Sequence, residues 1–122
     1  MDEIEFHPTV LVVEDEPLVR MLAVDYLERA GFTVLEAGCG SEALETLADH
    51  HEVAVLFSDI NMPGMDGMEL ARRVHETAPQ VRVILTSGRD APSNSIPGQG
   101  AFLPKPYFES EVTRLVHAAL AA

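Results

Sequence analysis

Lysine and arginine are scarce in this sequence, which contains only 8 of them against 20 aspartate and glutamate residues. The resulting net charge of -12 argues against a nucleic-acid ligand, because binding to a phosphate backbone needs clustered basic side chains. Cysteine is scarcer still, and we assign the single Cys39 no redox role. Most of the acidity serves to keep the surface soluble, so only locally clustered carboxylates need a further explanation.

Long apolar runs are also missing. No run approaches the roughly 20 residues that cross a membrane, and no signal peptide precedes the first apolar stretch. We therefore expect a cytoplasmic protein without membrane contact. With 47% hydrophobic residues, 122 residues suit one domain with an ordinary core. We expect residues 1–122 to form that single domain, with no output domain attached.

Five short apolar runs, rich in β-branched residues, alternate with patterns of helical spacing. The runs cover residues 9–13, 32–37, 53–57, 81–86 and 101–103. Helical patterns follow at about 17–30, 40–48, 67–78 and 110–120, with Ser110 as the expected N-cap of the last. This alternation predicts right-handed crossovers and a doubly wound α/β fold. We expect a five-stranded parallel sheet of order 2-1-3-4-5, flavodoxin-like, with helices on both faces.

Residues 89–100 interrupt this alternation, because they hold two prolines, two glycines and several serine and asparagine residues. Proline inside a helix costs ~3 kcal/mol and glycine ~1 kcal/mol relative to alanine. No apolar stripe offsets these costs by burial. We therefore expect the fourth helix of the pattern to be short or absent, and the segment to be mobile.

Acidic residues follow two of the expected strands. Glu14 and Asp15 come after the first run, and Asp59 lies at the carboxyl end of the third. The expected strand order brings these two ends together, where open α/β sheets place their sites. Three neighbouring carboxylates repel one another and need a cation, and hard oxygen ligands suit Mg²⁺. We expect Asp15 and Asp59 to bind it directly, Glu14 through water, and Asn61 through its backbone carbonyl.

Two further side chains are expected at the same edge. Lys105 follows the last run, where its ammonium adds a second positive charge, and Ser87 closes the fourth run with a small hydroxyl. An aspartate flanked by Mg²⁺, a lysine and a hydroxyl has the parts of a phosphoryl acceptor. Asp59 would attack in line, while Ser87 would hydrogen-bond the bound phosphoryl group.

The order of these motifs resembles the receiver domain of bacterial two-component response regulators over essentially the whole chain. The motifs are Glu14-Asp15, Asp59, the stretch 61–67, Ser87-Gly88 and Lys105-Pro106. The resemblance implies that a sensor kinase phosphohistidine, or a phosphotransfer protein, donates its phosphoryl group to Asp59. It implies that Ser87 and Phe102 switch conformation together and change a protein-binding face. It also implies a cis peptide before Pro106.

This sequence departs from the family pattern at the expected switch. Ser87 replaces the commoner threonine, and Thr86 just before it leaves two candidates, although Gly88 favours Ser87. Phe102 lacks the hydroxyl of a switch tyrosine. These departures, with the reduced fourth helix, suggest a divergent subgroup of receivers.

Other functions fit the residues less well. A haloacid dehalogenase-type enzyme needs a second acid where Asn61 stands, and the acids at 14–16 would repel a flavin phosphate. A calcium loop fails at Pro63 and Leu70. The remaining alternative is a receiver-like interaction module that works without phosphorylation. The sequence does not name the downstream partner.

Overall fold

The structure is a computed structural model, and it describes residues 7–122. Five strands occur in this part of the chain: β1 (Thr9–Val13), β2 (Thr33–Ala37), β3 (Val53–Asp59), β4 (Arg82–Ser87) and β5 (Ala101–Pro104). The helices are α1 (Pro17–Arg29), α2 (Gly40–Asp49), α3 (Gly67–Thr77) and α4 (Glu109–Ala121), with a short 3-10 turn, η1 (Pro97–Gln99). Each predicted strand and helix is therefore present, at nearly its predicted place.

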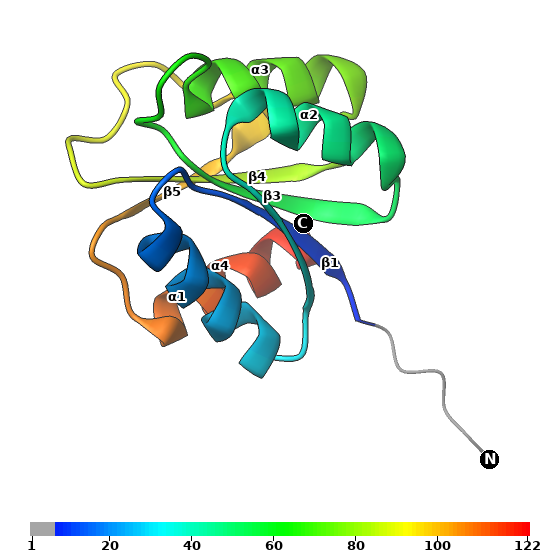
Figure 1. The fold of residues 1–122 in the computed structure, drawn as a ribbon, viewed down its shortest axis with the longest axis vertical. Coiled ribbons are helices and arrows are strands. Elements are labelled where there is room, and N and C mark those ends of the chain that lie inside the picture. The colour runs from blue at the N-terminus through cyan, green and yellow to red at the C-terminus, as the bar shows by residue number, and fades with distance from the viewer. Residues whose placement is uncertain (1–6) are drawn as a thin grey trace.

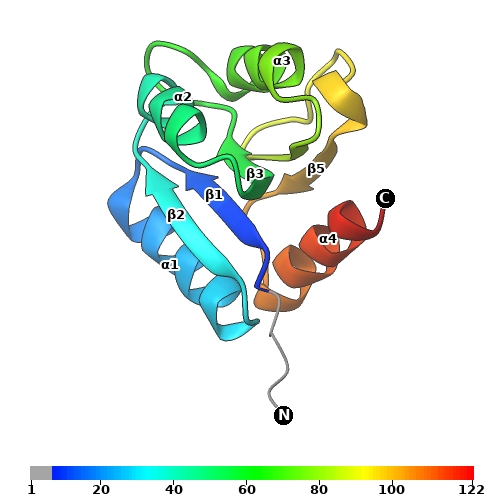
Figure 2. The same cartoon turned by 90° about the vertical axis from the view of Figure 1, so that its right-hand side faces the viewer.

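The five strands form one parallel sheet of order β2-β1-β3-β4-β5, which confirms the predicted topology. Helices α1 and α4 cover one face of the sheet, and α2 and α3 cover the other (Figures 1 and 2). Within residues 7–122, no helix combines the length and the apolar composition that a membrane crossing requires.

The central strands are buried on both faces. All five residues of β1 are buried, and their side chains alternate between two cores. Leu11 and Val13 pack towards α2 and α3, whereas Val10 and Val12 pack towards α1 and α4. This explains why the sequence shows unbroken apolar runs, as buried parallel strands do. The sheet is thus a packed frame whose carboxyl ends meet along one edge.

Several element boundaries differ by one or two residues from their predicted positions, and two of these differences have a clear local cause. The predicted cap at Ser110 is wrong, because α4 begins at Glu109 and its N-cap is Phe108. The carboxylate of Glu111 accepts the Phe108 N–H at 2.9 Å and so fixes the start of the helix earlier. Strand β2 begins one residue late, since the Phe32 N–H donates to the Leu27 carbonyl at 3.1 Å and closes the end of α1 instead.

The segment between β4 and β5 contains only η1, which confirms the prediction that the fourth helix of the pattern is short or absent. Ile96 packs against the core on the α2 and α3 side. Gly98 has a φ of 71°, a conformation that glycine adopts without strain. A surface hollow of about 540 Å³ lies between this segment and Phe102.

Candidate acidic metal and phosphoacceptor site

The predicted acids meet at the carboxyl edge of the sheet. Glu14 follows β1 directly, Asp59 is the last residue of β3, and the two strands are hydrogen-bonded neighbours. One carboxylate oxygen from each of Glu14, Asp15 and Asp59 lies within 4.8 Å of the other two. Glu14 and Asp59 are only 4% and 5% exposed, whereas Asp15 is open to solvent. The topology therefore forms an acidic pocket that is closed at its base and open at Asp15.

Lys105 enters this pocket from the end of β5. Its Nζ donates to Glu14 Oε1 at 2.8 Å and lies 3.4 Å from Asp59 Oδ2. The Lys105 N–H also donates to the Ser87 carbonyl at 2.9 Å, which ties the loop to the end of β4. The peptide between Lys105 and Pro106 is cis, as the resemblance implied. Sequence reasoning thus placed this side chain correctly, although 91 positions separate it from Glu14.

The charges of the pocket do not balance. One ammonium faces three carboxylates, and the pKa of Glu14 is raised because burial penalises its charged form. The negative charge of Asp59 raises this pKa further, while the hydrogen bond from Lys105 opposes the shift. Three hard oxygen donors with residual negative charge and an open side fit a divalent cation that keeps several water molecules. The donor set therefore matches the predicted metal chemistry.

Ser87 ends β4 with its side chain buried beside the pocket. Its Oγ accepts a hydrogen bond from Asn61 Nδ2 at 2.7 Å and another from the Arg89 N–H at 2.9 Å. Asn61 in turn donates its backbone N–H to Asp59 Oδ1 at 3.3 Å. One hydroxyl oxygen therefore joins the loop after Asp59 to the segment after β4. The use of the Asn61 carbonyl as a metal ligand stays a prediction.

Thr86, the other candidate for the switch, takes part in a different contact. It pairs with Asp59 in the sheet, and its carbonyl accepts the Ile60 N–H at 2.8 Å. Its role is to hold the backbone on either side of Asp59 in register. Phe102 lies half-buried on β5, opposite Leu85, and lines the hollow beside residues 89–100. A conformational switch at Ser87 and Phe102 stays a prediction.

Gly67 packs directly on the backbone of Asp59, although sequence reasoning treated it only as a turn and helix start. A Cβ at this position would lie 2.8 Å from Ile60 Cα and closer still to the Asp59 carbonyl oxygen. Only glycine lets the first turn of α3 pack so tightly on the backbone of Asp59. The Gly67 N–H also donates to the Ile60 carbonyl at 2.9 Å, which closes the loop.

Two further residues near the pocket were missed. Arg20 on α1 donates from Nη1 to the Glu14 carbonyl at 2.7 Å and holds that backbone in place. Tyr107 is buried, with its ring 5.7 Å from that of Phe57 in an edge-on arrangement. Burial raises the pKa of Tyr107, and the charges of Glu14 and Asp59 add to the effect, so its hydroxyl stays protonated. The aromatic residue after Lys105-Pro106 was a visible signal, whereas nothing marked Arg20.

Comparison with known proteins gives one consistent result. The family model of the response regulator receiver domain matches residues 10–117. The sensor kinase CckA of Brucella abortus (strain 2308) is 41% identical over 117 residues, covering 92% of this chain and 12% of that protein. The transcriptional regulatory protein SrrA of Staphylococcus aureus (strain NCTC 8325 / PS 47) is 35% identical over 115 residues, covering 91% of this chain and 47% of that protein.

A solved structure adds information on the fold. The response regulator protein TrrA of Thermotoga maritima, crystallised in complex with Mg²⁺ and BeF, superposes with a TM-score of 0.83 at 25% identity. The match covers 91% of this chain and 97% of that one. The chain thus spans about half or less of the curated relatives named above, and nearly all of this solved structure.

Proposed function

The chain belongs to the response regulator receiver domain family, and from this premise we propose that Asp59 is its phosphoacceptor. A receiver domain is a module of two-component signalling rather than an enzyme in the main sense. The observation that carries the proposal is the position of Asp59, buried at a strand end, 3.4 Å from the Lys105 ammonium and beside two further carboxylates.

The transfer uses groups already in place. An oxygen of Asp59 forms a bond to phosphorus while the bond from phosphorus to the donor breaks, the donor being a phosphohistidine nitrogen of a sensor kinase or phosphotransfer protein. Lys105 moves its hydrogen bond towards the new phosphoryl oxygens. Glu14, Asp15 and Asp59 would hold Mg²⁺, which neutralises charge on the transferring group when it is bound. Dephosphorylation is a separate hydrolysis at the same site: a water oxygen bonds to phosphorus while the bond from phosphorus to the Asp59 oxygen breaks, which releases inorganic phosphate and restores the carboxylate.

Ser87 has the hydrogen-bonding state that the proposal needs. A serine hydroxyl offers two acceptor positions and one donor. Asn61 and Arg89 use both acceptor positions, so the hydroxyl hydrogen is the group left to donate to a phosphoryl oxygen on Asp59. Because the Arg89 N–H donates a hydrogen bond to Ser87 Oγ, a shift of this hydroxyl oxygen moves the start of the segment 89–100. We therefore place the responsive protein-binding face on this segment, Phe102 and α4.

Incubation with acetyl phosphate and Mg²⁺, followed by intact mass spectrometry, tests the proposal. The wild-type protein should gain the mass of one phosphoryl group, and Asp59→Asn should not. Asp90→Asn is the matched control, because it removes one exposed acid outside the pocket and should be phosphorylated like wild type. An equal adduct on Asp59→Asn would exclude Asp59. No adduct on wild type would favour the alternative, an interaction module that works without phosphorylation.

A further inference from the structure

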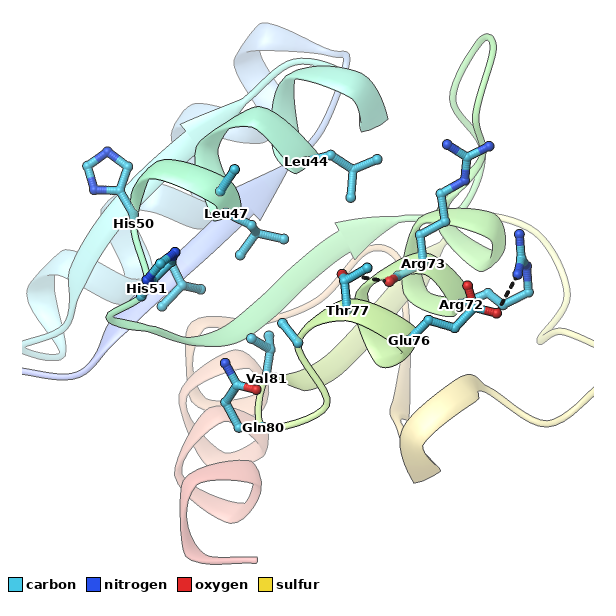
Figure 3. Close-up of a pocket in the computed structure, with 13 residues that line it drawn as sticks. Leu44, Leu47, His50, His51, Arg72, Arg73, Glu76, Thr77, Gln80 and Val81 are labelled. Atoms are coloured by element: carbon cyan, nitrogen blue, oxygen red, sulfur yellow. Dashed lines mark hydrogen bonds and ion pairs between the residues drawn. The ribbon is translucent and has the colours of Figure 1, made fainter.

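A second recessed surface lies away from the acidic pocket, between α2 and α3. We call it the α2–α3 groove and define it by Leu44, Leu47, His51, Val53, Arg73 and Val81. Its volume is about 800 Å³. Figure 3 shows Leu44 and Leu47 on the α2 side, His51 at the end of that helix, and Arg73 on the α3 side. The groove thus has an apolar floor and a polar rim.

The apolar floor is incompletely covered in the monomer. Val53 and Val81 are buried at the base, but Leu44 and Leu47 are only partly buried where they pack against the core. A groove of this kind, walled by two helices, suits the apolar face of a third helix. Burial of the two leucines would supply the non-specific part of the binding energy.

The rim of the groove holds more basic than acidic side chains, unlike the chain as a whole. The chain carries a net charge of -12, yet the thirteen lining residues, all within the described part of the chain, include two arginines, two histidines and a single acid. That acid, Glu76, accepts a hydrogen bond from Arg72 at 2.7 Å. The charged groups of the rim are therefore its two arginines and Glu76, and Glu69 on the same helix also pairs with both arginines.

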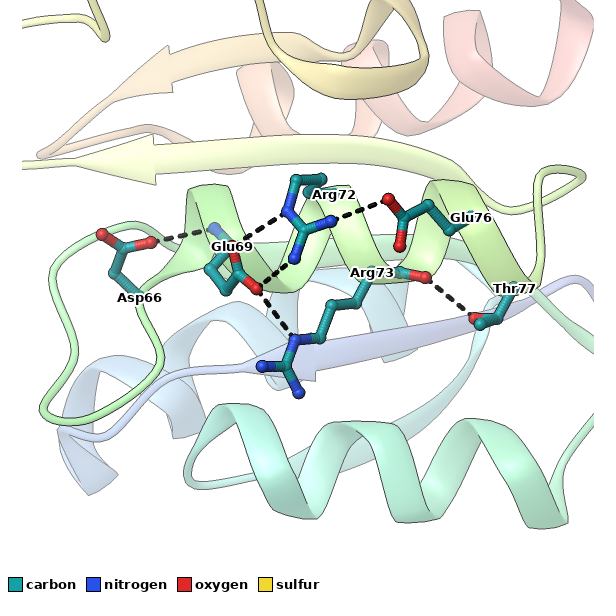
Figure 4. Close-up of polar contacts among 6 residues, drawn as sticks. All are labelled: Asp66, Glu69, Arg72, Arg73, Glu76 and Thr77. Atoms are coloured by element: carbon teal, nitrogen blue, oxygen red, sulfur yellow. Dashed lines mark hydrogen bonds and ion pairs between the residues drawn. The ribbon is translucent and has the colours of Figure 1, made fainter.

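Two neighbouring arginines differ in the number of hydrogen bonds that they make (Figure 4). All three guanidinium nitrogens of Arg72 donate to Glu69 or Glu76. Arg73 donates only from Nε, to Glu69 Oε2 at 2.9 Å in an ion pair, and its two Nη groups donate no hydrogen bond within residues 7–122. Those Nη groups form the flat fork that binds a carboxylate through two hydrogen bonds.

We propose that the α2–α3 groove binds an acidic amphipathic helix of another protein. The apolar side chains of that helix, spaced i, i+4 and i+7, contact Leu44, Leu47 and Val81. A glutamate or aspartate beside them pairs with the free fork of Arg73. The interaction goes beyond the phosphoacceptor function and does not depend on it, because the groove lies at the amino end of β3 and Asp59 at its carboxyl end.

A synthetic peptide of about 14 residues can serve as the probe, since this length gives nearly four helical turns. It carries leucines at i, i+4 and i+7 with glutamates alongside. A control peptide has the same composition, with the leucines spread around the helix. Fluorescence anisotropy measures binding to wild type, Arg73→Glu and Arg114→Glu. Arg114 is the matched control, because it is an exposed arginine on α4, outside the groove.

We expect Arg73→Glu to weaken binding about tenfold or more, because it replaces an attractive contact with a repulsive one. Arg114→Glu should change binding less than about twofold, because α4 covers the opposite face of the sheet from the groove and salt screens its exposed charge. Ala48→Glu adds a negative charge on the α2 side and should also weaken binding, without disturbing the core. Asp59→Asn should bind like wild type, so a failure of the phosphoacceptor assignment leaves this result unaffected.

Three results would overturn the proposal. The first is equal binding of the two peptides, which would show attraction by charge alone. The second is an equal effect of Arg73→Glu and Arg114→Glu, with both variants melting like wild type. The third is an absence of any wild-type binding up to about millimolar peptide, the weak end of specific association.

Discussion

Replacement of Gly67 by alanine tests how the acidic pocket is built. The added Cβ would lie 2.8 Å from Ile60 Cα and nearer still to the Asp59 carbonyl oxygen. Both neighbours are backbone atoms of one strand end, so no rotation of a side chain can relieve the contact. Overpacking of this kind typically costs about 1–3 kcal/mol, and a clash with backbone belongs at the upper end.

The expected loss of stability is large enough to measure by thermal melting. A domain of this size loses about 4 °C in melting temperature per kcal/mol, so a loss of about 2–3 kcal/mol lowers it by roughly 10 °C. Displacement of the Asp59 backbone should also slow phosphorylation by acetyl phosphate, because a shift of about 1 Å can cost about 100-fold in rate.

The same chain offers a matched control. A Cβ on Gly88 would meet nothing within 4 Å, and Gly88 follows β4 at the same edge of the sheet. Gly88→Ala should therefore melt within about 2 °C of wild type, as surface substitutions usually do. If Gly67→Ala melts at the temperature of Gly88→Ala and is phosphorylated equally fast, the close contact between α3 and β3 has no such role.

Further predictions concern the metal, the pH and the segment after β4. Mg²⁺ at about 100 times its Kd should stabilise the protein by about 2.7 kcal/mol, or roughly 10 °C, and Asp15→Asn should lose most of this gain; equal gains would remove Asp15 as a ligand. Hydrogen bonds from Arg72 and Arg73 lower the pKa of Glu69 to about 2. The stability that this carboxylate contributes is present above its unfolded pKa and is lost as the pH falls through about 2. Urea unfolding should therefore separate wild type from Glu69→Gln at pH 6 but not below pH 2. Amide hydrogen exchange across residues 89–100 should be fast in the free protein and should slow when Mg²⁺ and the phosphoryl mimic beryllofluoride are added. Strong protection in the free protein would mean that the segment is a preformed element.

Much of the fold could be predicted because the central strands are buried on both faces. Such strands must be apolar throughout, so they are visible as runs without alternation, and their ends locate Glu14, Asp59 and Ser87. The right-handed crossover rule then brings distant ends together without any knowledge of contacts. The family match confirms the resemblance that these motifs indicated, and the observed strand order confirms the topology.

The features that were missed depend on side chains from different elements. The contact of Arg20 with the Glu14 carbonyl joins a helix to a loop, and a surface arginine on a helix gives no sign of it. The cap at Phe108 depends on Glu111, whose carboxylate reaches back three residues to the Phe108 N–H. The sequence pattern favoured the more familiar serine cap at Ser110 instead. The hydroxyl shared by Asn61 and Arg89 requires the geometry of two loops. Patterns along the chain carry little information on such contacts.

The course of β3 through the molecule has a consequence for assembly. This strand of seven residues, roughly 20 Å long, begins at the α2–α3 groove and ends at Asp59. A helix bound in the groove therefore leaves Asp59 uncovered at the other end of the strand. A partner tethered in the groove would present the phosphoacceptor to any kinase bound to that same partner at a high effective concentration. The fold would then act as a scaffold, in which proximity rather than affinity sets how often Asp59 meets its donor.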